Sequence, residues 1–156
     1  MKKIQALTKK VFDENFSNEK FIYYNDYACF ISILDFDNEE TKYDTTIDNF
    51  LQVKMSDVER DVVLNGVIKY EKPNDSELLK IVDFVNRNKD KTNFIIHCSA
   101  GLSRSGAVAS YIADKFHTEV DRYEFIRNNK QIQPNLYILS QLHKLDNYEI
   151  YIWTQF

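Results

Sequence analysis

The segment Asn93-Phe94-Ile95-Ile96-His97-Cys98-Ser99-Ala100-Gly101-Leu102-Ser103-Arg104-Ser105-Gly106 decides the fold of this chain. Residues 93–96 form a short apolar run between polar residues, which predicts a buried strand that ends at His97. Residues 105–116 carry apolar side chains at helical spacing and no proline, which predicts a helix. The segment therefore predicts a strand, a tight loop and a helix in direct succession.

Cys98 and Arg104 are separated by five residues, a spacing that lets one short loop surround a tetrahedral oxyanion. In such a loop the backbone N–H groups point inward and the arginine donates to two oxygens. The positive end of the following helix points at the same place. The pattern predicts a phosphate pocket with Cys98 as nucleophile beneath the phosphorus. The expected phosphate-binding residues are Ser99, Ala100, Gly101, Leu102, Ser103 and Arg104.

These surroundings favour the thiolate form of Cys98. A free cysteine has a pKa of about 8.5, and a nearby arginine or helix N-terminus lowers it to about 3.5–7.5. We expect Ser105 to donate its hydroxyl to the sulfur and His97 to orient the loop by hydrogen bonds between its ring and the backbone. Gly101 allows a backbone angle that a β-carbon would resist. The alternative is an ordinary buried thiol beside a surface arginine.

At these residues the chain resembles the cysteine-dependent protein phosphatases, specifically the small bacterial and phage members of the dual-specificity-like branch. The signature His-Cys-x-x-Gly-x-x-Arg-Ser is matched by His97, Cys98, Gly101, Arg104 and Ser105. The resemblance covers residues 48–145 and is loose over the first 45. It implies an α/β fold of three layers, with a mostly parallel central sheet flanked by helices. It also implies a metal-independent phosphomonoesterase with a cysteinyl-phosphate intermediate.

The leaving oxygen needs a proton from a carboxylic acid on a neighbouring loop. Asp57 follows the strand predicted at residues 50–55, and a strand end would place it at the pocket mouth. Family members often carry Phe-Asp-Asp where this chain has Met55-Ser56-Asp57, so only the second acid is kept. We carry the role of general acid over to Asp57.

Asp57 lies 41 residues before Cys98, a longer gap than in many family members, and the extra residues 59–72 would form an inserted segment. Asp61, Asp75 and the absence of any acid are therefore alternatives. Asp75 is better interpreted as a helix N-cap, because Asn74-Asp75-Ser76-Glu77 has helix-start chemistry.

The rest of the chain alternates strands and helices. Further strands are predicted at residues 3–7, 27–34 and 50–55, and further helices at 78–85, 121–129 and 135–147. Residues 9–16 are helical or irregular, residues 35–48 form a polar connection, and residues 58–70 are interpreted as a short helix that ends near Gly66. The aromatic tail at 150–156 is interpreted as an edge strand on the core, or alternatively as a partner-binding segment.

The 156 residues, with 44% hydrophobic content, 3 glycines and 2 prolines, indicate a single catalytic domain over residues 1–156. A net charge of −4 argues against nucleic-acid binding. The longest apolar run, residues 27–34, is too short to span a membrane, and no signal peptide is recognisable, so a cytoplasmic location is expected. Cys29 is interpreted as a core residue, or alternatively as a resolving thiol. No Cys/His pair has ligand spacing, so we expect neither a metal nor a cofactor.

The leading hypothesis is a protein-tyrosine or dual-specificity phosphatase. Its partner would be a phosphorylated protein or another phosphomonoester, and the uncharged residues 99–103 favour a single phosphoryl group. The alternatives are a module that binds phosphate without turnover, and a phosphatase of a nucleotide, RNA end or small molecule. The basic residues Arg122, Arg127 and Lys130 are interpreted as a solvated helix face, or alternatively as a substrate-docking patch.

Overall fold

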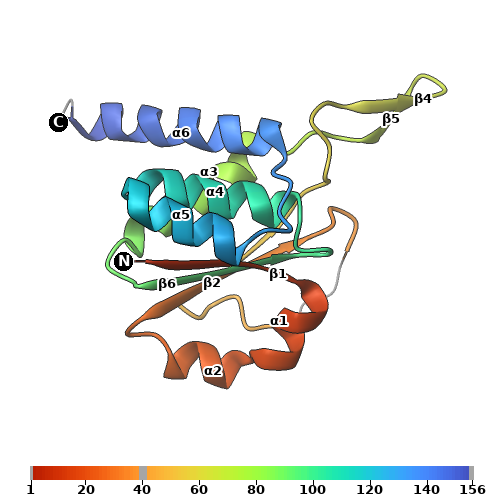
Figure 1. The fold of residues 1–156 in the computed structure, drawn as a ribbon. Helices are drawn as coiled ribbons and strands as arrows, with labels where there is room; N and C mark the ends of the chain where they lie inside the picture. The colour runs from red at the N-terminus through yellow and green to blue at the C-terminus, as the bar shows by residue number, and fades with distance from the viewer. Residues whose placement is uncertain (1, 39–41, 155–156) are drawn as a thin grey trace.

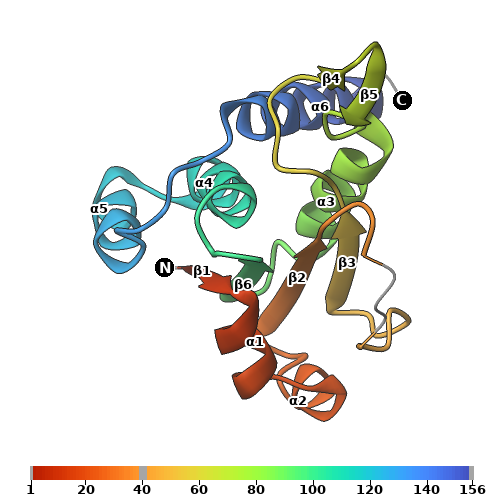
Figure 2. The same ribbon diagram turned by 90° about the vertical axis from the view of Figure 1, so that its right-hand side faces the viewer.

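Four parallel strands form the central sheet of the computed structural model, which describes residues 2–38 and 42–154, with side chains described up to residue 147. The strands are β1 (Lys3–Thr8), β2 (Ala28–Leu34), β3 (Phe50–Lys54) and β6 (Asn93–Cys98), in the spatial order β1-β6-β2-β3. All three neighbouring pairs are parallel. The carboxyl ends of these strands therefore lie along one edge of the sheet, which faces the viewer in Figure 2.

Helices cover both faces of the sheet (Figure 1). One face carries α1 (Lys9–Asn15) and α2 (Asn18–Tyr23). The other carries α3 (Asp75–Arg87), α4 (Arg104–Phe116) and α5 (Glu119–Asn128), and α6 (Leu136–Thr154) packs outside α3 and α4. The structure thus confirms the three-layer α/β architecture with a parallel central sheet.

The two helical layers explain why β2 is apolar at every residue except Ser32. Every residue of β2 is buried. Its Ile31 and Ile33 belong to the core beneath α3 and α4, whereas Phe30 belongs to the aromatic core beneath α1 and α2. Successive side chains of a strand point to opposite faces, so a strand covered on both sides is apolar on both. The exception, Ser32, is buried with its hydroxyl bonded to His97.

A β-hairpin occupies residues 62–70, where the sequence analysis expected a short helix. Strands β4 (Val62–Leu64) and β5 (Val67–Tyr70) pair antiparallel and project from the body of the molecule (Figure 1). Asn65 and Gly66 join them with φ values of 53° and 77°. Two positive φ values are typical of a type I′ turn, for which Asn-Gly is the strongest sequence signal. The prediction of a helix at residues 58–70 was wrong, because Asn65-Gly66 favours a hairpin turn over a helix.

Three other elements differ from the sequence predictions. Helix α2 was not predicted, although Ser17 caps it by accepting from the Lys20 N–H. The N-cap of α3 is Asn74, not Asp75, which is the first residue of the helix. Helix α6 continues to Thr154, so the edge strand expected at 150–156 is wrong for residues 150–154, and residues 155–156 lie outside the described residues. None of the helices that the structure describes is long and apolar enough to cross a membrane.

Candidate active site

The loop between β6 and α4 lies at the carboxyl edge of the sheet. Strand β6 ends at Cys98 and α4 begins at Arg104, so residues 99–103 form the whole connection. Strand β6 lies between β1 and β2, which places Cys98 at an inner strand of the sheet. Residues that follow the ends of β2 and β3 can therefore reach this loop.

Outward hydrogen bonds of the loop carbonyls hold the loop in its curved shape. The Leu102 carbonyl accepts from the Gln133 N–H at 2.9 Å and the Ser103 carbonyl accepts from the Asn135 N–H at 3.0 Å. On the inner side, the N–H groups of Gly101 and Ser105 donate to the Cys98 sulfur. The loop thus presents donors to its centre and acceptors to its supporting segment, an arrangement suited to an anion.

Gly101 is required by the close approach of the loop to β1. Its φ is +68°, and a β-carbon there would lie 2.6 Å from the Leu7 carbonyl carbon and 2.7 Å from the Thr8 nitrogen. Backbone atoms cannot move aside as a flexible side chain can, so any larger residue would displace the loop.

The Cys98 sulfur is buried, and hydrogen bonds stabilise its charge. Burial alone would raise the pKa of Cys98, but the Ser105 hydroxyl, the N–H groups of Ser105 and Gly101, and the Arg104 charge together lower this pKa below its ordinary value. The Ser105 Oγ lies 3.1 Å from the Cys98 Sγ. Because thiolate is the nucleophilic form of cysteine, these contacts prepare Cys98 for attack.

Arg104 is nearly buried, and both terminal nitrogens of its guanidinium donate hydrogen bonds within the protein. Nη1 donates to Asp35 Oδ1 at 2.7 Å and to the Met55 carbonyl at 2.9 Å, and Nη2 donates to Ser99 Oγ at 3.2 Å. The buried Nε has no hydrogen-bond partner within the protein. An unpaired buried donor is costly, so an anion acceptor in the loop would satisfy it.

Asp57 is the one of the three candidate acids that contacts the loop. Its Oδ1 accepts from Ser103 Oγ at 2.8 Å and from Asn135 Nδ2 at 3.0 Å. Ser103, the N-cap residue of α4, makes no side-chain capping hydrogen bond to the helix. The N-terminus of α4 therefore has no side-chain cap, which suits an anion in the loop.

The other two acids serve structural hydrogen bonds elsewhere. Asp61 Oδ1 accepts from the Lys72 N–H at 2.9 Å across the base of the hairpin. Asp75 Oδ1 accepts from Gln141 Nε2 at 2.9 Å, which links the start of α3 to α6.

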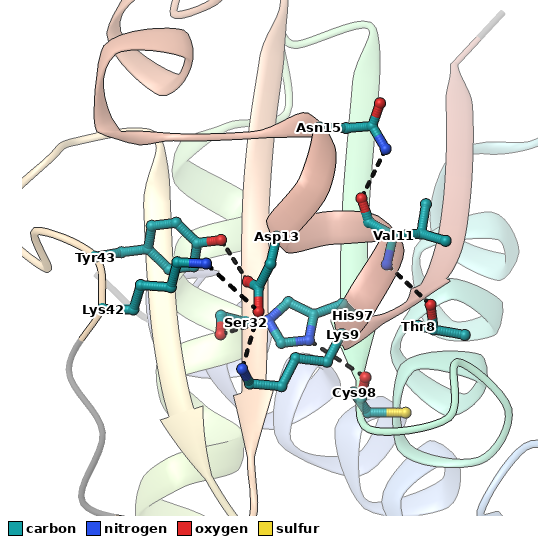
Figure 3. Close-up of polar contacts among 10 residues, drawn as sticks. All are labelled: Thr8, Lys9, Val11, Asp13, Asn15, Ser32, Lys42, Tyr43, His97 and Cys98. Carbon is teal, nitrogen blue, oxygen red and sulfur yellow. Dashed lines mark hydrogen bonds and ion pairs between the residues drawn. The ribbon is translucent and has the colours of Figure 1, made fainter.

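His97 supports the loop from behind (Figure 3). Its Nδ1 lies 3.3 Å from the Cys98 carbonyl and its Nε2 lies 2.7 Å from Ser32 Oγ. A carbonyl can only accept, so Nδ1 carries the proton and Ser32 donates to Nε2. Burial lowers the pKa of His97 to about 4, and the ring is therefore neutral at pH 7.

Cys29 is a core residue and is not placed to resolve Cys98. Its strand partner in β6 is Phe94, four residues before Cys98 and hence about 13 Å away along the strand. Disulfide formation needs Cα atoms within about 7 Å. Burial also raises the pKa of the Cys29 thiol well above its ordinary value.

The predicted basic cluster is partly neutralised by acids. Arg122 pairs with Asp114, and Arg127 pairs with Glu124 at 3.0 Å. These pairs favour the interpretation as a solvated helix face over that as a docking patch.

Asp35 and Asn135 are the site residues that the sequence analysis missed. Asp35 directly follows the predicted strand at 27–34, so the rule that ligands bind beyond the carboxyl ends of parallel strands could have found it. Asn135 was noticed only as the start of a helix. Its contact with Asp57 spans 78 positions of the sequence and has no local signal.

A model of the dual specificity phosphatase catalytic domain matches residues 18–148. The chain belongs to this family. It is therefore a cysteine-dependent phosphatase of the dual-specificity class. A curated relative from Amsacta moorei entomopoxvirus, named "Putative tyrosine-protein phosphatase AMV078", is 25% identical over 134 residues, which are 84% of this chain and 75% of the relative.

Solved structures show the same fold at low sequence identity. Human DUSP28 has a TM-score of 0.55 and 12% identity, over 95% of this chain and 94% of that one. PTPMT1 in complex with PI(5)P has a TM-score of 0.51 and 14% identity, over 94% of this chain and 91% of that one. The human tyrosine phosphatase-like serine/threonine/tyrosine-interacting protein has a TM-score of 0.50 and 15% identity, over 87% of both chains.

Proposed function

We propose that this dual-specificity phosphatase hydrolyses phosphomonoesters on protein side chains through a phosphate carried on Cys98. One observation carries the proposal: the buried Cys98 sulfur receives hydrogen bonds from Ser105 and Gly101, while the unpaired Nε of the nearly buried Arg104 awaits an acceptor. This combination suits a dianionic phosphoryl group above a thiolate.

In the first step the Cys98 thiolate attacks phosphorus in line with the leaving oxygen. The S–P bond forms as the P–O bond to the substrate breaks, and the loop N–H groups and Arg104 stabilise the equatorial oxygens. Preorganised donors of this kind are usually the largest contribution to catalysis. Their fixed positions cost no reorganisation during the reaction.

Asp57, in its protonated form, gives its proton to the leaving oxygen. Its hydrogen bonds with Ser103 and Asn135 hold the carboxyl at the rim of the loop and support this role. In the second step water attacks phosphorus, Asp57 accepts a proton from that water, and the P–S bond breaks. The Ser105 hydroxyl donates to the departing sulfur, which stabilises it as thiolate.

The loop favours substrates with one phosphoryl group. Residues 99–103 carry no charged side chain, so a second phosphate beside the first would meet no cation from these residues. A phosphorylated protein side chain fits this requirement. A catalytic thiolate is active only while it is not oxidised, which supports a reducing compartment such as the cytoplasm.

The proposal is tested by measuring hydrolysis of p-nitrophenyl phosphate and of a panel of substrates. The panel contains phosphopeptides, phosphonucleotides and phosphosugars. Cys98→Ser should abolish turnover of every substrate. Asp57→Ala should lower kcat by roughly 10²–10⁴ for alkyl phosphates, and Asp61→Ala and Asp75→Ala serve as matched controls with kcat near wild type. Binding of phosphate by the wild type without turnover would instead support the recognition module.

A further inference from the structure

A cavity of about 560 Å³ opens directly beside the active site. Asp35 and Asp57 line it, and the same two side chains contact Arg104 and Ser103 of the catalytic loop. The cavity is therefore adjacent to the place where phosphate would bind. Its volume lies in the range of about 300–1,000 Å³ that is typical of ligand sites.

The hairpin forms the far wall of this cavity. Ile68 and Tyr70 of β5 line it, and Phe36 lines it from the connection after β2. All three are large apolar side chains that stay exposed, at 49%, 45% and 59%. Exposed apolar side chains gathered around one cavity mark a binding surface, whereas single ones need no explanation.

The charged groups around the cavity are mostly acidic. Asp35, Asp37, Asp57 and Glu71 line it, and Lys69 is the one cation among the lining residues that the structure describes. Lys69 also lies 5.4 Å from the centre of the Tyr70 ring. Because Asp35 is paired with Arg104 and Asp57 carries a proton as the general acid, Asp37 and Glu71 set the charge of the cavity. These two carboxylates attract cationic groups and repel further phosphates.

Resting on the proposed function, we propose that this cavity is a specificity site for the polypeptide around the phosphorylated residue. The cavity would bind the residues that flank the phosphorylated side chain. Among these flanking residues it would select an apolar residue together with a lysine or arginine. The hairpin inserted between Asp57 and α3 supplies the apolar wall, and Asp37 and Glu71 supply the charge.

The same charges disfavour other phosphorylated compounds. A polyphosphorylated headgroup or nucleotide would bring additional phosphates against Asp37 and Glu71. A phosphopeptide brings a single phosphoryl group to the loop, and its basic flank reaches the acids. The charge pattern thus favours binding of a phosphoprotein substrate over binding of a polyanionic one.

The test compares kcat/KM for two phosphopeptides that differ only in flanking residues, arginine in one and glutamate in the other. The wild type should prefer the arginine peptide by about fivefold to tenfold, since exposed ion pairs each contribute modestly. The double variant Asp37→Lys, Glu71→Lys should abolish or reverse this preference, and Asp26→Lys, on an exposed residue outside the cavity, should keep it. The preference should also vanish at about 1 M salt, where the screening length is about 3 Å.

The apolar wall has its own matched pair of variants. Ile68→Ala should lower kcat/KM severalfold for a peptide with an apolar flank, whereas Val67→Ala, which changes an exposed neighbour outside the cavity, should not. Equal kcat/KM for the two charged peptides in the wild type would overturn the specificity site. Turnover of p-nitrophenyl phosphate by the same preparation shows separately whether the proposed function holds.

Discussion

Arg104 Nη1 donates to Asp35 Oδ1 at 2.7 Å, while Arg104 Nε, on the same guanidinium, has no partner in the protein. The Arg104 side chain is only 6% exposed and that of Asp35 is 56% exposed. Asp35 therefore holds one edge of the guanidinium from the solvent side. This contact leaves Nε without a partner and able to donate to a phosphate oxygen.

Replacement of Asp35 tests its role as a positioning residue for Arg104. Asp35→Ala should lower kcat by about 10–100-fold, because small displacements of a catalytic group have effects of this size. Asp35→Asn retains an oxygen acceptor and should recover most of the lost kcat. Asp35→Asn should unfold at nearly the wild-type denaturant concentration, since it keeps an acceptor for the buried Arg104. Wild-type kcat in Asp35→Ala would show that Arg104 needs no such support.

Gly101 and Gly66 provide a matched pair of positive-φ glycines. Gly66→Ala should destabilise the protein by only about 1–2 kcal/mol, the usual cost of left-handed backbone, because nothing lies within 4 Å of a β-carbon there. Gly101→Ala adds a clash with the backbone of Leu7 and Thr8 and should cost more stability and most of the activity. Denaturant unfolding and p-nitrophenyl phosphate assays measure the two effects. Equal loss of stability in the two variants would argue against the close approach to β1.

The hydroxyl of Ser105 lowers the pKa of Cys98. Ser105→Ala should therefore raise the pH midpoint of Cys98 alkylation by iodoacetamide and slow the breakdown of the cysteinyl phosphate. Ser110→Ala, on the same helix, is the control and should leave the midpoint unchanged. An unchanged midpoint in Ser105→Ala would mean that the loop amides and Arg104 suffice.

His97 makes the folded protein sensitive to acid. The pKa of His97 is about 4 in the folded state, against about 6.5 in the unfolded chain. Between these values the unfolded state binds the proton and the folded state does not, so stability falls as the pH falls through this window. The full loss is about 3 kcal/mol for a shift of this size. Denaturant unfolding at several pH values measures it.

Nuclear magnetic resonance of the three histidines checks the assignment of this acid sensitivity. One ring should titrate near pH 4 and should disappear from the spectrum in His97→Gln. Titration of all three rings near pH 6.5 would contradict the buried, neutral His97.

The sequence allowed the central part of the fold to be predicted because its signals are local. The apolar run before Cys98, the spacing from Cys98 to Arg104 and the helical periodicity after it each lie within a few residues. Asp57 was predicted from its place after a strand, and it contacts Ser103 in the structure.

The remainder depended on contacts between distant segments or on a turn signal that was not used. Asp35 meets Arg104 across 69 positions, and Ser32 meets His97 across 65. Neither pair carries a spacing pattern that a single sequence reveals. The hairpin was different, since Asn65-Gly66 is a strong local signal for it.

Trapping of the phosphorylated enzyme tests the central claim most directly. Asp57→Ala, mixed with p-nitrophenyl phosphate and quenched in acid, should carry one phosphate on the peptide that contains Cys98, as detected by mass spectrometry. The same experiment with Cys98→Ser should show no turnover and no phosphate released from substrate. Steady hydrolysis by Cys98→Ser, or a phosphate trapped on a different residue of the Asp57→Ala enzyme, would contradict the account.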